Sequence, residues 1–407
     1  MEQVLPKIRF PEFNENWDKK KLGEISQLIT KGTTPKKFIN EGIKFIKLEC
    51  FEGDKINGDK CLFIDENTHN KELKRSILKE NDLLFAIAGA TIGKVNFVTN
   101  EILPANTNQA LSIIRLKEEE CKNYIYQILK SDRMKRYITD SISVGAQPNL
   151  NLEQMNNFTF FYPTTVEQSK IAKFLTTVDE KLQTLKQKKT LLEQYKKGVM
   201  QKIFSQELRF KDDNGNEYLD WEEKKLGDTL NITVDNRGKT PPTLEHGIPL
   251  LEVNSIGNKN IKYNAVSKFV SELTFETWFR KHLKKGDVLF STVGNTALCS
   301  YYDGNIKACI AQNIVGLRFN TDIGLFMYYL LIEDRNNNKF KQIEMGAVQP
   351  SVKVSQMIDI FFEIPSIPEQ NKIANFLSTI DNKINHCQEQ IVNTEVWKKG
   401  LLQQMFV

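Results

Sequence analysis

Residues 163–204 read PTTVEQSKIAKFLTTVDEKLQTLKQKKTLLEQYKKGVMQKIF, and residues 365–406 read PSIPEQNKIANFLSTIDNKINHCQEQIVNTEVWKKGLLQQMF. At a constant offset of 202 residues, the two stretches are identical at 17 of 42 positions. A match of this length at one fixed spacing indicates that a segment has been duplicated within the chain.

Apolar residues recur in both stretches at intervals of four and three, and this pattern predicts two long helices. The spacing holds for about five heptads and is typical of a coiled-coil seam. The positions expected to pair the helices are Ile171, Leu175, Val178, Leu182, Leu185 and Leu192 in the first stretch and Ile373, Leu377, Ile380, Ile384 and Ile391 in the second.

A capping box is expected to open each helix. Thr164 and Ser366 place a hydroxyl at the N-cap, and Glu167 and Glu369 place a carboxylate three residues later. Some 38 residues at about 1.5 Å each predict a rod of roughly 57 Å.

Polar residues interrupt both seams, at Lys189 and Lys196 in the first and at Thr394 and Lys398 in the second. Such residues either fix the register of the pair or mark the point where a partner protein takes over. The first helix is also the more basic, because residues 167–204 hold nine lysines against four acidic residues. That excess suits a solvated face as well as a face turned toward DNA or another subunit.

The duplication extends over the whole chain. Trp17 to Gly23 recurs as Trp221 to Gly227, and Leu78 to Phe85 recurs as Leu283 to Phe290. The offset drifts between 200 and 206 residues, as small loop insertions would produce. Two copies at this spacing indicate duplicated domains and a pseudo-two-fold molecule, since a solenoid would show shorter periods and more copies.

The duplication also predicts how the chain closes. The first repeat begins near Ile8 and ends at Phe204, and the second ends at Phe406. Ile8 is therefore the natural continuation of the C-terminal helix. We expect the chain to form a ring with its two ends close together.

The part of each half before its long helix has a mixed pattern. Short alternating runs between turns rich in Gly, Asn and Thr predict strands at Ile43–Leu48, Asp82–Ala88, Leu111–Leu116, Ile248–Val253, Asp287–Thr292 and Ile314–Phe319. Helices are expected at Tyr124–Tyr137 and Leu325–Ile332. The predicted fold class is α+β, with globular domains at 1–162 and 206–364 and spacer helices at 163–205 and 365–407.

Several function classes lack their sequence signatures. The chain has no run long enough to span a membrane, no signal-peptide layout and no phosphate-binding glycine loop. It also lacks the Asn-Pro-Pro-aromatic sequence with which amino-methyltransferases hold adenine. Six scattered cysteines and four isolated histidines predict neither a metal site nor catalytic residues, and a reduced, cytoplasmic protein fits best.

Loops rich in cations, hydroxyls and amides suit DNA, because these groups bind phosphates and base edges. The net charge of +5 is compatible with such a partner. Each of these residues could equally serve a turn or a cap. The candidate DNA contacts are Lys31, Thr33, Thr34, Lys36, Thr91, Asn108, Gln109 and Gln147 in the first half and Arg237, Lys239, Thr240, Asn295, Thr296, Gln312, Asn313 and Gln349 in the second.

Taken together, these motifs resemble the specificity subunits of Type I restriction–modification systems. Each half shows an early Trp-x-x-x-x-Leu-Gly, a Gly-x-x-Pro loop and a Gly followed closely by Gln-Pro. Pro-x-x-x-Glu-Gln-x-Lys-Ile-Ala then opens the long helix. Each motif alone is weak, but their order, repeated twice over nearly the whole chain, is highly specific.

This resemblance implies that each globule is a target recognition domain that reads one half of a split DNA sequence. The long helices would pair as an antiparallel coiled coil between the two readers. Two methyltransferase subunits carrying S-adenosylmethionine would dock on this frame, and two restriction subunits using ATP and Mg²⁺ could join them. The chain itself would be non-catalytic and would hold no cofactor.

Two other classes of function remain as alternatives. A cryptic nuclease or methyltransferase would modify DNA as the purified chain alone. A coiled-coil scaffold would leave the assembled complex without any sequence preference.

Overall fold

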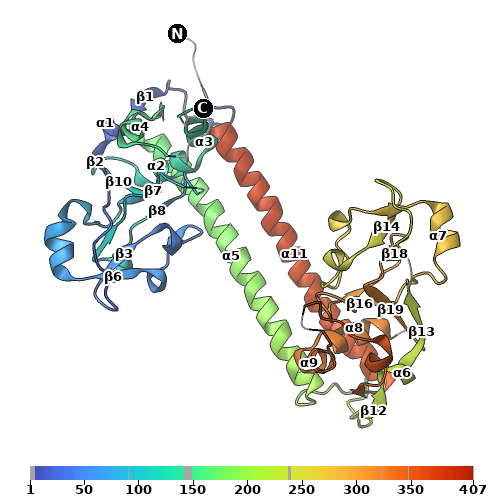
Figure 1. Ribbon diagram of the computed structural model, residues 1–407. Coiled ribbons are helices and arrows are strands. Elements are labelled where there is room, and N and C mark those ends of the chain that lie inside the picture. The colour runs from blue at the N-terminus through green and yellow to red at the C-terminus, as the bar shows by residue number, and fades with distance from the viewer. Residues whose placement is uncertain are drawn as a thin grey trace. The chain divides into compact units, whose positions relative to one another are not determined.

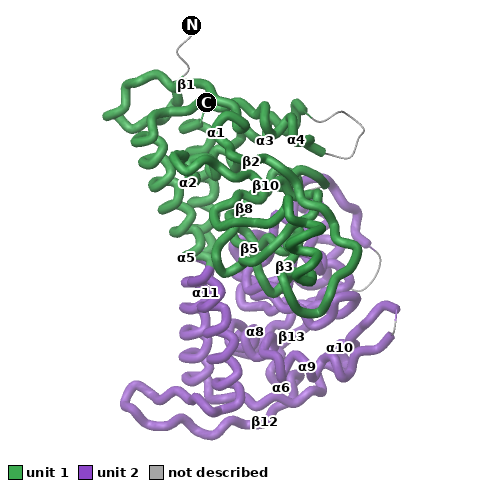
Figure 2. Tube along the Cα trace, turned by 90° about the vertical axis from the view of Figure 1, so that its left-hand side faces the viewer, with its two compact units in different colours: residues 1–186, 388–407 green, residues 187–387 purple. Residues whose placement is uncertain are grey.

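The computed structural model describes residues 5–89, 91–141, 149–236, 240–321, 323–346 and 348–406. By its internal contacts the chain divides into two compact units (Figure 2). Unit 1 comprises residues 1–186 and 388–407, and unit 2 comprises residues 187–387. Each unit therefore combines one globular domain with one part of each long helix.

The two long helices predicted from the heptads are present, as α5 (Thr165–Phe204) and α11 (Ile367–Met405), side by side in Figure 1. In unit 1 the beginning of α5 lies against the end of α11, and the Phe174 and Trp397 rings meet edge to face at 6.0 Å. In unit 2 the end of α5 packs with the beginning of α11. The helices thus pair antiparallel, which confirms the expected coiled coil.

The globular part of unit 1 contains a four-stranded sheet, a three-stranded sheet and two strand pairs. The antiparallel four-stranded sheet has the order β2 (Ser26–Lys31), β10 (Leu111–Leu116), β7 (Leu83–Ala86), β8 (Val95–Phe97). The second sheet has the order β6 (Leu62–Ile64), β3 (Ile43–Ile46), β9 (Ala105–Thr107). The remaining elements are the strand pairs β1 (Asp18–Lys21) with β11 (Thr159–Tyr162) and β4 (Phe51–Glu52) with β5 (Lys55–Ile56), and the helices α1 (Leu22–Ile25), α2 (Lys122–Lys130), α3 (Asp132–Ser141) and α4 (Leu152–Asn157).

Unit 2 repeats this plan. Its four-stranded sheet has the order β13 (Leu230–Asp235), β19 (Ile314–Phe319), β16 (Val288–Ser291), β17 (Cys299–Tyr301). Its second sheet has the order β15 (Phe269–Val270), β14 (Ile248–Leu251), β18 (Cys309–Ile310). The other elements are β12 (Glu222–Lys225), β20 (Phe361–Ile364), α6 (Leu226–Thr229), α7 (Glu272–Trp278), α8 (Gly324–Ile332), α9 (Asp334–Gln342) and α10 (Val354–Met357). The two α+β domains predicted from the duplication are therefore confirmed.

All six predicted strands are present, but the helix expected at Tyr124–Tyr137 is in fact two helices, α2 and α3. The break falls at Ser131, whose backbone is extended and whose hydroxyl donates to the Ile128 carbonyl at 2.6 Å. The corresponding residue in unit 2, Glu333, separates α8 from α9 and accepts a hydrogen bond from the Asn336 N–H. A polar residue that satisfies local backbone groups ends the first helix in both units.

The core of each unit is completed by both long helices. In unit 1, side chains of the sheet and α2 pack with Ile171, Leu175 and Val178 of α5 and with Leu401, Leu402, Met405 and Phe406 of α11. In unit 2, Ile373, Leu377 and Ile380 pack with Val199, Met200, Ile203 and Phe204. Of the other seam residues, Leu182 and Ile391 are buried, and Leu185, Leu192 and Ile384 are half-buried. The outer heptads of the seam therefore hold the domains as well as the partner helix.

The predicted capping boxes form only in part. The Glu167 N–H donates to Thr164 Oγ1 at 3.4 Å, but the Glu167 carboxylate accepts from the Arg9 guanidinium at 2.7 and 2.8 Å and from Trp17 Nε1 at 3.0 Å. Because this carboxylate is buried, it requires a cationic partner rather than a backbone amide alone.

The capping box predicted at Ser366 and Glu369 in unit 2 is replaced by the same kind of contacts. Glu369 binds Arg209 and Trp221, and Ser366 Oγ has no hydrogen-bond partner among the described residues. In both units the glutamate at the start of the long helix binds the arginine and the tryptophan near the beginning of that half.

The two ends of the chain meet in unit 1, as the duplication predicts. The Ile8 N–H donates to the Gln404 carbonyl at 3.0 Å. In unit 2 the Leu208 N–H makes the same bond to the Lys202 carbonyl, also at 3.0 Å. The segment around Ile8 therefore contacts the end of α11 in the same way that the segment around Leu208 contacts the end of α5.

The lysines that interrupt the seams divide into two kinds. Lys196 forms an ion pair across the helices with Asp381 at 2.6 Å, and Lys398 pairs in the same way with Asp179. Lys189 pairs within its own helix, with Glu193 at 2.8 Å. The Thr394 hydroxyl donates to the Gln390 carbonyl. Lys196 and Lys398 therefore act as register-fixing residues, and Lys189 and Thr394 do not.

Each seam aspartate is also held by its own domain. Asp381 accepts from the Tyr329 hydroxyl at 2.6 Å, and Asp179 accepts from Gln127 Nε2 at 3.0 Å. Burial, followed by the nearby Asp381 charge, raises the pKa of Tyr329, so its hydroxyl remains a donor at neutral pH. These hydrogen bonds link domain, first helix and second helix at one point in each unit.

Lys196→Met should destabilise the protein, because it leaves the largely buried Asp381 carboxylate without its cation. Loss of one partner of a buried ion pair costs about 3 kcal/mol, or roughly 5–10 °C in the melting temperature of the unit. Lys197→Met is the matched control, since the neighbouring Lys197 pairs with Asp334 in an exposed salt bridge worth below about 1 kcal/mol. Equal shifts for the two variants in a thermal melt would contradict this assignment.

Candidate nucleic-acid interface

The predicted DNA-contacting loops of unit 1 meet at one edge of the four-stranded sheet. Because neighbouring strands are antiparallel, the ends of β2 and β7 lie beside the starts of β8 and β10. We call this the loop edge of unit 1. It carries Lys31 at the end of β2, Thr33, Thr34 and Lys36 after it, Thr91 between β7 and β8, and Asn108 and Gln109 before β10.

Direct hydrogen bonds join the loops. Thr34 Oγ1 donates to Gln109 Oε1 at 2.6 Å, and Arg75 Nη2 donates to Thr33 Oγ1 at 2.8 Å. Arg75 belongs to a short 3₁₀ turn and was not among the predicted contacts. Sequence reasoning missed it because it lies outside the loops rich in glycine, hydroxyls and amides on which the prediction rested.

Gly32 has a steric reason to be glycine. A Cβ at this position would lie 1.8 Å from the Thr107 carbonyl oxygen and 2.6 Å from that of Asn108. The loop after β2 therefore packs with its backbone directly on the loop before β10. Only glycine permits this approach, which brings Thr34 to Gln109.

Several polar residues near this edge serve the fold. Asn106 is buried and bonded to His69, Ser76 and the Leu73 carbonyl, and the Thr107 hydroxyl donates to the Ile46 carbonyl. Asn108 accepts a turn hydrogen bond from the Ala110 N–H, whereas Lys31, Lys36 and Gln109 are exposed and Thr91 is half-buried. The predicted contact Gln147 lies outside the described residues.

Unit 2 builds the same edge from β13, β16, β17 and β19. The chain after α9 joins it, because the Gly294 N–H donates to the Pro350 carbonyl at 2.8 Å and the Val352 N–H to the Thr292 carbonyl at 2.8 Å. Arg237 and Lys239 lie outside the described residues. The candidates brought to this edge are Asn295, Thr296, Gln312, Asn313 and Gln349, and Thr240 lies on the chain between β13 and β14.

One of these candidates is engaged within the fold. The Thr296 hydroxyl is buried and donates to Glu344 at 2.6 Å. Thr240, Asn295, Gln312 and Gln349 are exposed, and Asn313 is half-buried. The exposed amides are the better placed to meet a ligand.

The histidines and carboxylates show no catalytic arrangement in the ranges that the structure describes. His69 binds Asn106, and the His282 ring stacks on Phe275 at 4.3 Å. Among the described residues, no group of three His, Cys, Asp or Glu could hold a metal ion. Within the same ranges, no helix is long and apolar enough to cross a membrane.

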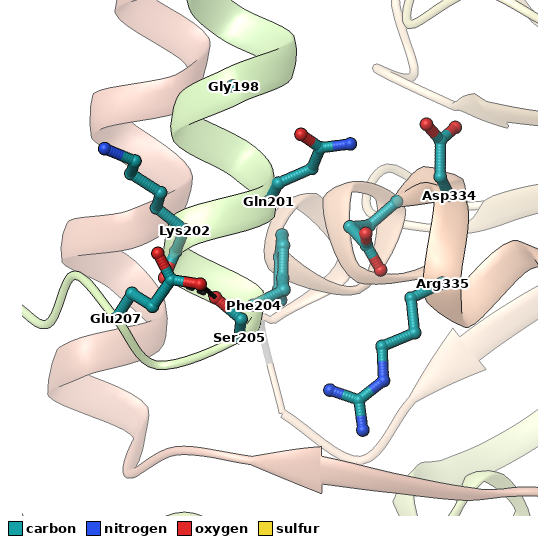
Figure 3. A pocket seen from close by; sticks show the side chains of 9 residues that line it. Gly198, Gln201, Lys202, Phe204, Ser205, Glu207, Asp334 and Arg335 are labelled. Atoms are coloured by element: carbon teal, nitrogen blue, oxygen red, sulfur yellow. Dashed lines mark hydrogen bonds between the residues drawn. The ribbon is translucent and has the colours of Figure 1, made fainter.

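A separate groove of about 500 Å³ lies in unit 2 where α5 ends beside the start of α9 (Figure 3). None of the predicted DNA contacts lines it. Its charged side chains are of both signs, and Ser205 donates to Glu207 at 3.1 Å. The lining residues are Gly198, Gln201, Lys202, Phe204, Ser205, Glu207, Glu333, Asp334 and Arg335.

Comparison with known proteins agrees with this architecture. The family model described as "Type I restriction modification DNA specificity domain" matches residues 14–194 and 218–394. The MjaVIII specificity subunit of a Type I restriction enzyme from Methanocaldococcus jannaschii is 23% identical over 412 residues, covering 97% of this chain and 92% of the relative. The HindI specificity subunit from Haemophilus influenzae is 26% identical over 155 residues, covering 36% of this chain and 32% of the relative.

Two solved structures share the fold. The crystal structure of a Type I restriction–modification S subunit from M. genitalium superposes with a TM-score of 0.61 and 16% identity, covering 99% of both chains. A structure described as the basis of complex assembly and conformational transition of the type I R-M system has a TM-score of 0.56 and 15% identity, covering 96% of this chain and 97% of that one. Because the family model matches most of the sequence in two copies, this chain belongs to the Type I restriction–modification DNA specificity family, whose members are recognition components and not catalytic ones.

Proposed function

We propose that this chain recognises a DNA target in two parts, with each unit reading one part through its loop edge. The observation that carries the proposal is that one frame builds the same edge twice. Each edge presents hydroxyl and amide side chains on short loops above a rigid sheet. Such groups read base edges and position phosphates, whereas the frame beneath them sets their geometry.

The proposal assigns the chemistry to partner subunits. Two methyltransferase subunits would supply S-adenosylmethionine, and two restriction subunits, where present, would supply ATP and Mg²⁺. The chain itself would bind no cofactor and would act in the cytoplasm. Exposed apolar side chains on the helices suit such protein partners, namely Val392, Val396 and Trp397 in unit 1 and Leu191 and Tyr195 in unit 2.

The groove of Figure 3 offers a second contact for a partner. Gly198 lies within α5, where glycine weakens a helix, yet a Cβ there would meet open space. Nothing within 4 Å of that position requires a glycine. Close approach of a partner subunit's backbone to α5 would explain why this position is a glycine.

Sequencing of modified bases in genomic DNA, with and without this gene, tests the proposal directly. Deletion should abolish methylation of adenines in one split motif. Methylation of such a motif by the purified chain alone would favour the cryptic enzyme instead, and a complex without sequence preference would favour the scaffold.

Gly32→Ala should impair reading of the half-site bound by unit 1. The added Cβ would overlap the Thr107 carbonyl, so the loop after β2 must move away from Gln109. We expect a loss of methylation of at least tenfold, an order-of-magnitude figure for the loss of one or two base contacts. Gly58→Ala is the control, because its Cβ would make ordinary contacts at 3.5 Å. Equal activity of the two variants would show that this loop does not contribute to recognition.

Exchanging residues 12–160 for the matching part of a relative should change one half of the recognised sequence and leave the other half intact. The reason is that each loop edge is built within its own unit. The methylated motif of the hybrid complex reports the outcome. A change in both halves would disprove the two-reader proposal.

Two copies of a fragment 1–204, combined with the methyltransferase, should methylate a palindromic split site. Each fragment exposes a seam that can pair with its copy, and the repeat places Asp179 opposite Lys196 of the second copy, as Asp179 stands opposite Lys398 in the full chain. Light scattering and the methylated motif test the assembly. A monomeric fragment, or one that modifies the asymmetric parent site, would refute it.

A further inference from the structure

The two units place opposite charges at one equivalent point of their loop edges. Lys31 ends β2 and pairs with Ser112 of β10, and Asp235 ends β13 and pairs with Val315 of β19. Both strand pairs have their register shift at the same place, so the alignment of the two sheets is unambiguous. A cation in one unit therefore stands where an anion stands in the other.

A second point on the edge also differs between the units. Leu150 and Val352 bind equivalent carbonyls, each at 2.8 Å, so the residues that follow them, Asn151 and Lys353, are equivalent. The Asn151 side chain caps α4 by accepting from the Gln154 N–H at 2.8 Å. Lys353 holds the same N-cap position before α10 and makes no side-chain cap, since an ammonium group has no acceptor. Lysine at this position therefore contributes no side-chain cap to α10.

Asp235 and Lys353 line one hollow of about 310 Å³ at the loop edge of unit 2. Ile314, Val315 and Val352 form its apolar floor. The exposed polar residues Gln312 and Ser355 complete its rim. The hollow therefore places a hydrogen-bond acceptor and a cationic donor on one small surface with an apolar floor.

This combination suits a base pair better than the DNA backbone. A carboxylate accepts hydrogen bonds only and is repelled by phosphates, whereas it accepts well from the amino group of cytosine. An ammonium group donates to O6 and N7 of guanine. In the major groove a guanine–cytosine pair presents these groups next to each other.

We propose that Asp235 and Lys353 read one guanine–cytosine pair in the half-site bound by unit 2. Lys31 supplies only a donor at the equivalent point of unit 1, so the two half-sites differ at this position. The inference rests on the proposed function of the loop edge and goes beyond it by naming the readers and the base pair.

The test uses the full chain assembled with its methyltransferase, on DNA libraries in which each position of the split site varies. Asp235→Asn and Lys353→Met should each lower the preference for the guanine–cytosine pair at one position of one half-site, by roughly 5- to 150-fold. Preference at all other positions should stay as in the wild type. Glu276→Gln and Lys383→Met serve as controls, because these exposed residues carry the same charges on α7 and α11.

Three outcomes would overturn the inference. Unchanged selectivity would show that these side chains do not read bases. Uniform weakening at every sequence, with a shallower salt dependence, would assign Lys353 to phosphate binding. Altered preference in both half-sites would show that these two residues do not act on the half-site of unit 2 alone. A wild-type complex that methylates no split motif would instead refute the proposed function, so the two failures are distinguishable.

Discussion

Each domain of this protein depends on an apolar seam that it cannot bury alone. The sheet and α2 of unit 1 close their core only with side chains from the beginning of α5 and the end of α11. Unit 2 uses the opposite ends of the same helices. Burial of apolar surface is the main favourable term in folding, so each core recruits both helices. Helix pairing and domain folding are consequently one process and not two independent ones.

Polar contacts then give this apolar assembly a unique arrangement. The buried carboxylates of Glu167 and Glu369 bind the arginine and tryptophan at the start of each half, and the Lys196–Asp381 and Lys398–Asp179 pairs fix how the helices meet. An unpaired charge in such surroundings is costly, so a shifted register would leave these groups unsatisfied. The motif Glu-Gln-x-Lys-Ile-Ala is therefore a structural signature, although it served as a family marker in the sequence.

Comparison of the two units separates a shared structural frame from loop edges that differ. Asp82 holds Arg115 through two hydrogen bonds, and Asp287 holds Arg318 in the same way, so this contact belongs to the frame. At the loop edges, by contrast, the equivalent positions carry different residues. Lys31 in unit 1 corresponds to Asp235 in unit 2, and Asn151 corresponds to Lys353. Packing restricts the Asp–Arg positions of the frame, because protein interiors tolerate little change. Positions at the solvent-facing loop edge are not restricted by packing in this way, so they can differ between the units.

The sequence by itself determined the duplication, the two long helices, the α+β class and the meeting of the chain ends, because each rests on periodicity or on repeated motifs along the chain. It also located the loops of the candidate interface, since cations, hydroxyls and amides cluster there. Tertiary structure alone decided which of those side chains are exposed: Thr296 is buried and bonded to Glu344, whereas its neighbour Asn295 is exposed. It alone brought Arg75 to Thr33, and Asp235 to the hollow lined by Lys353. Such juxtapositions join residues far apart in the chain, and local patterns carry no information about them until the strands pair.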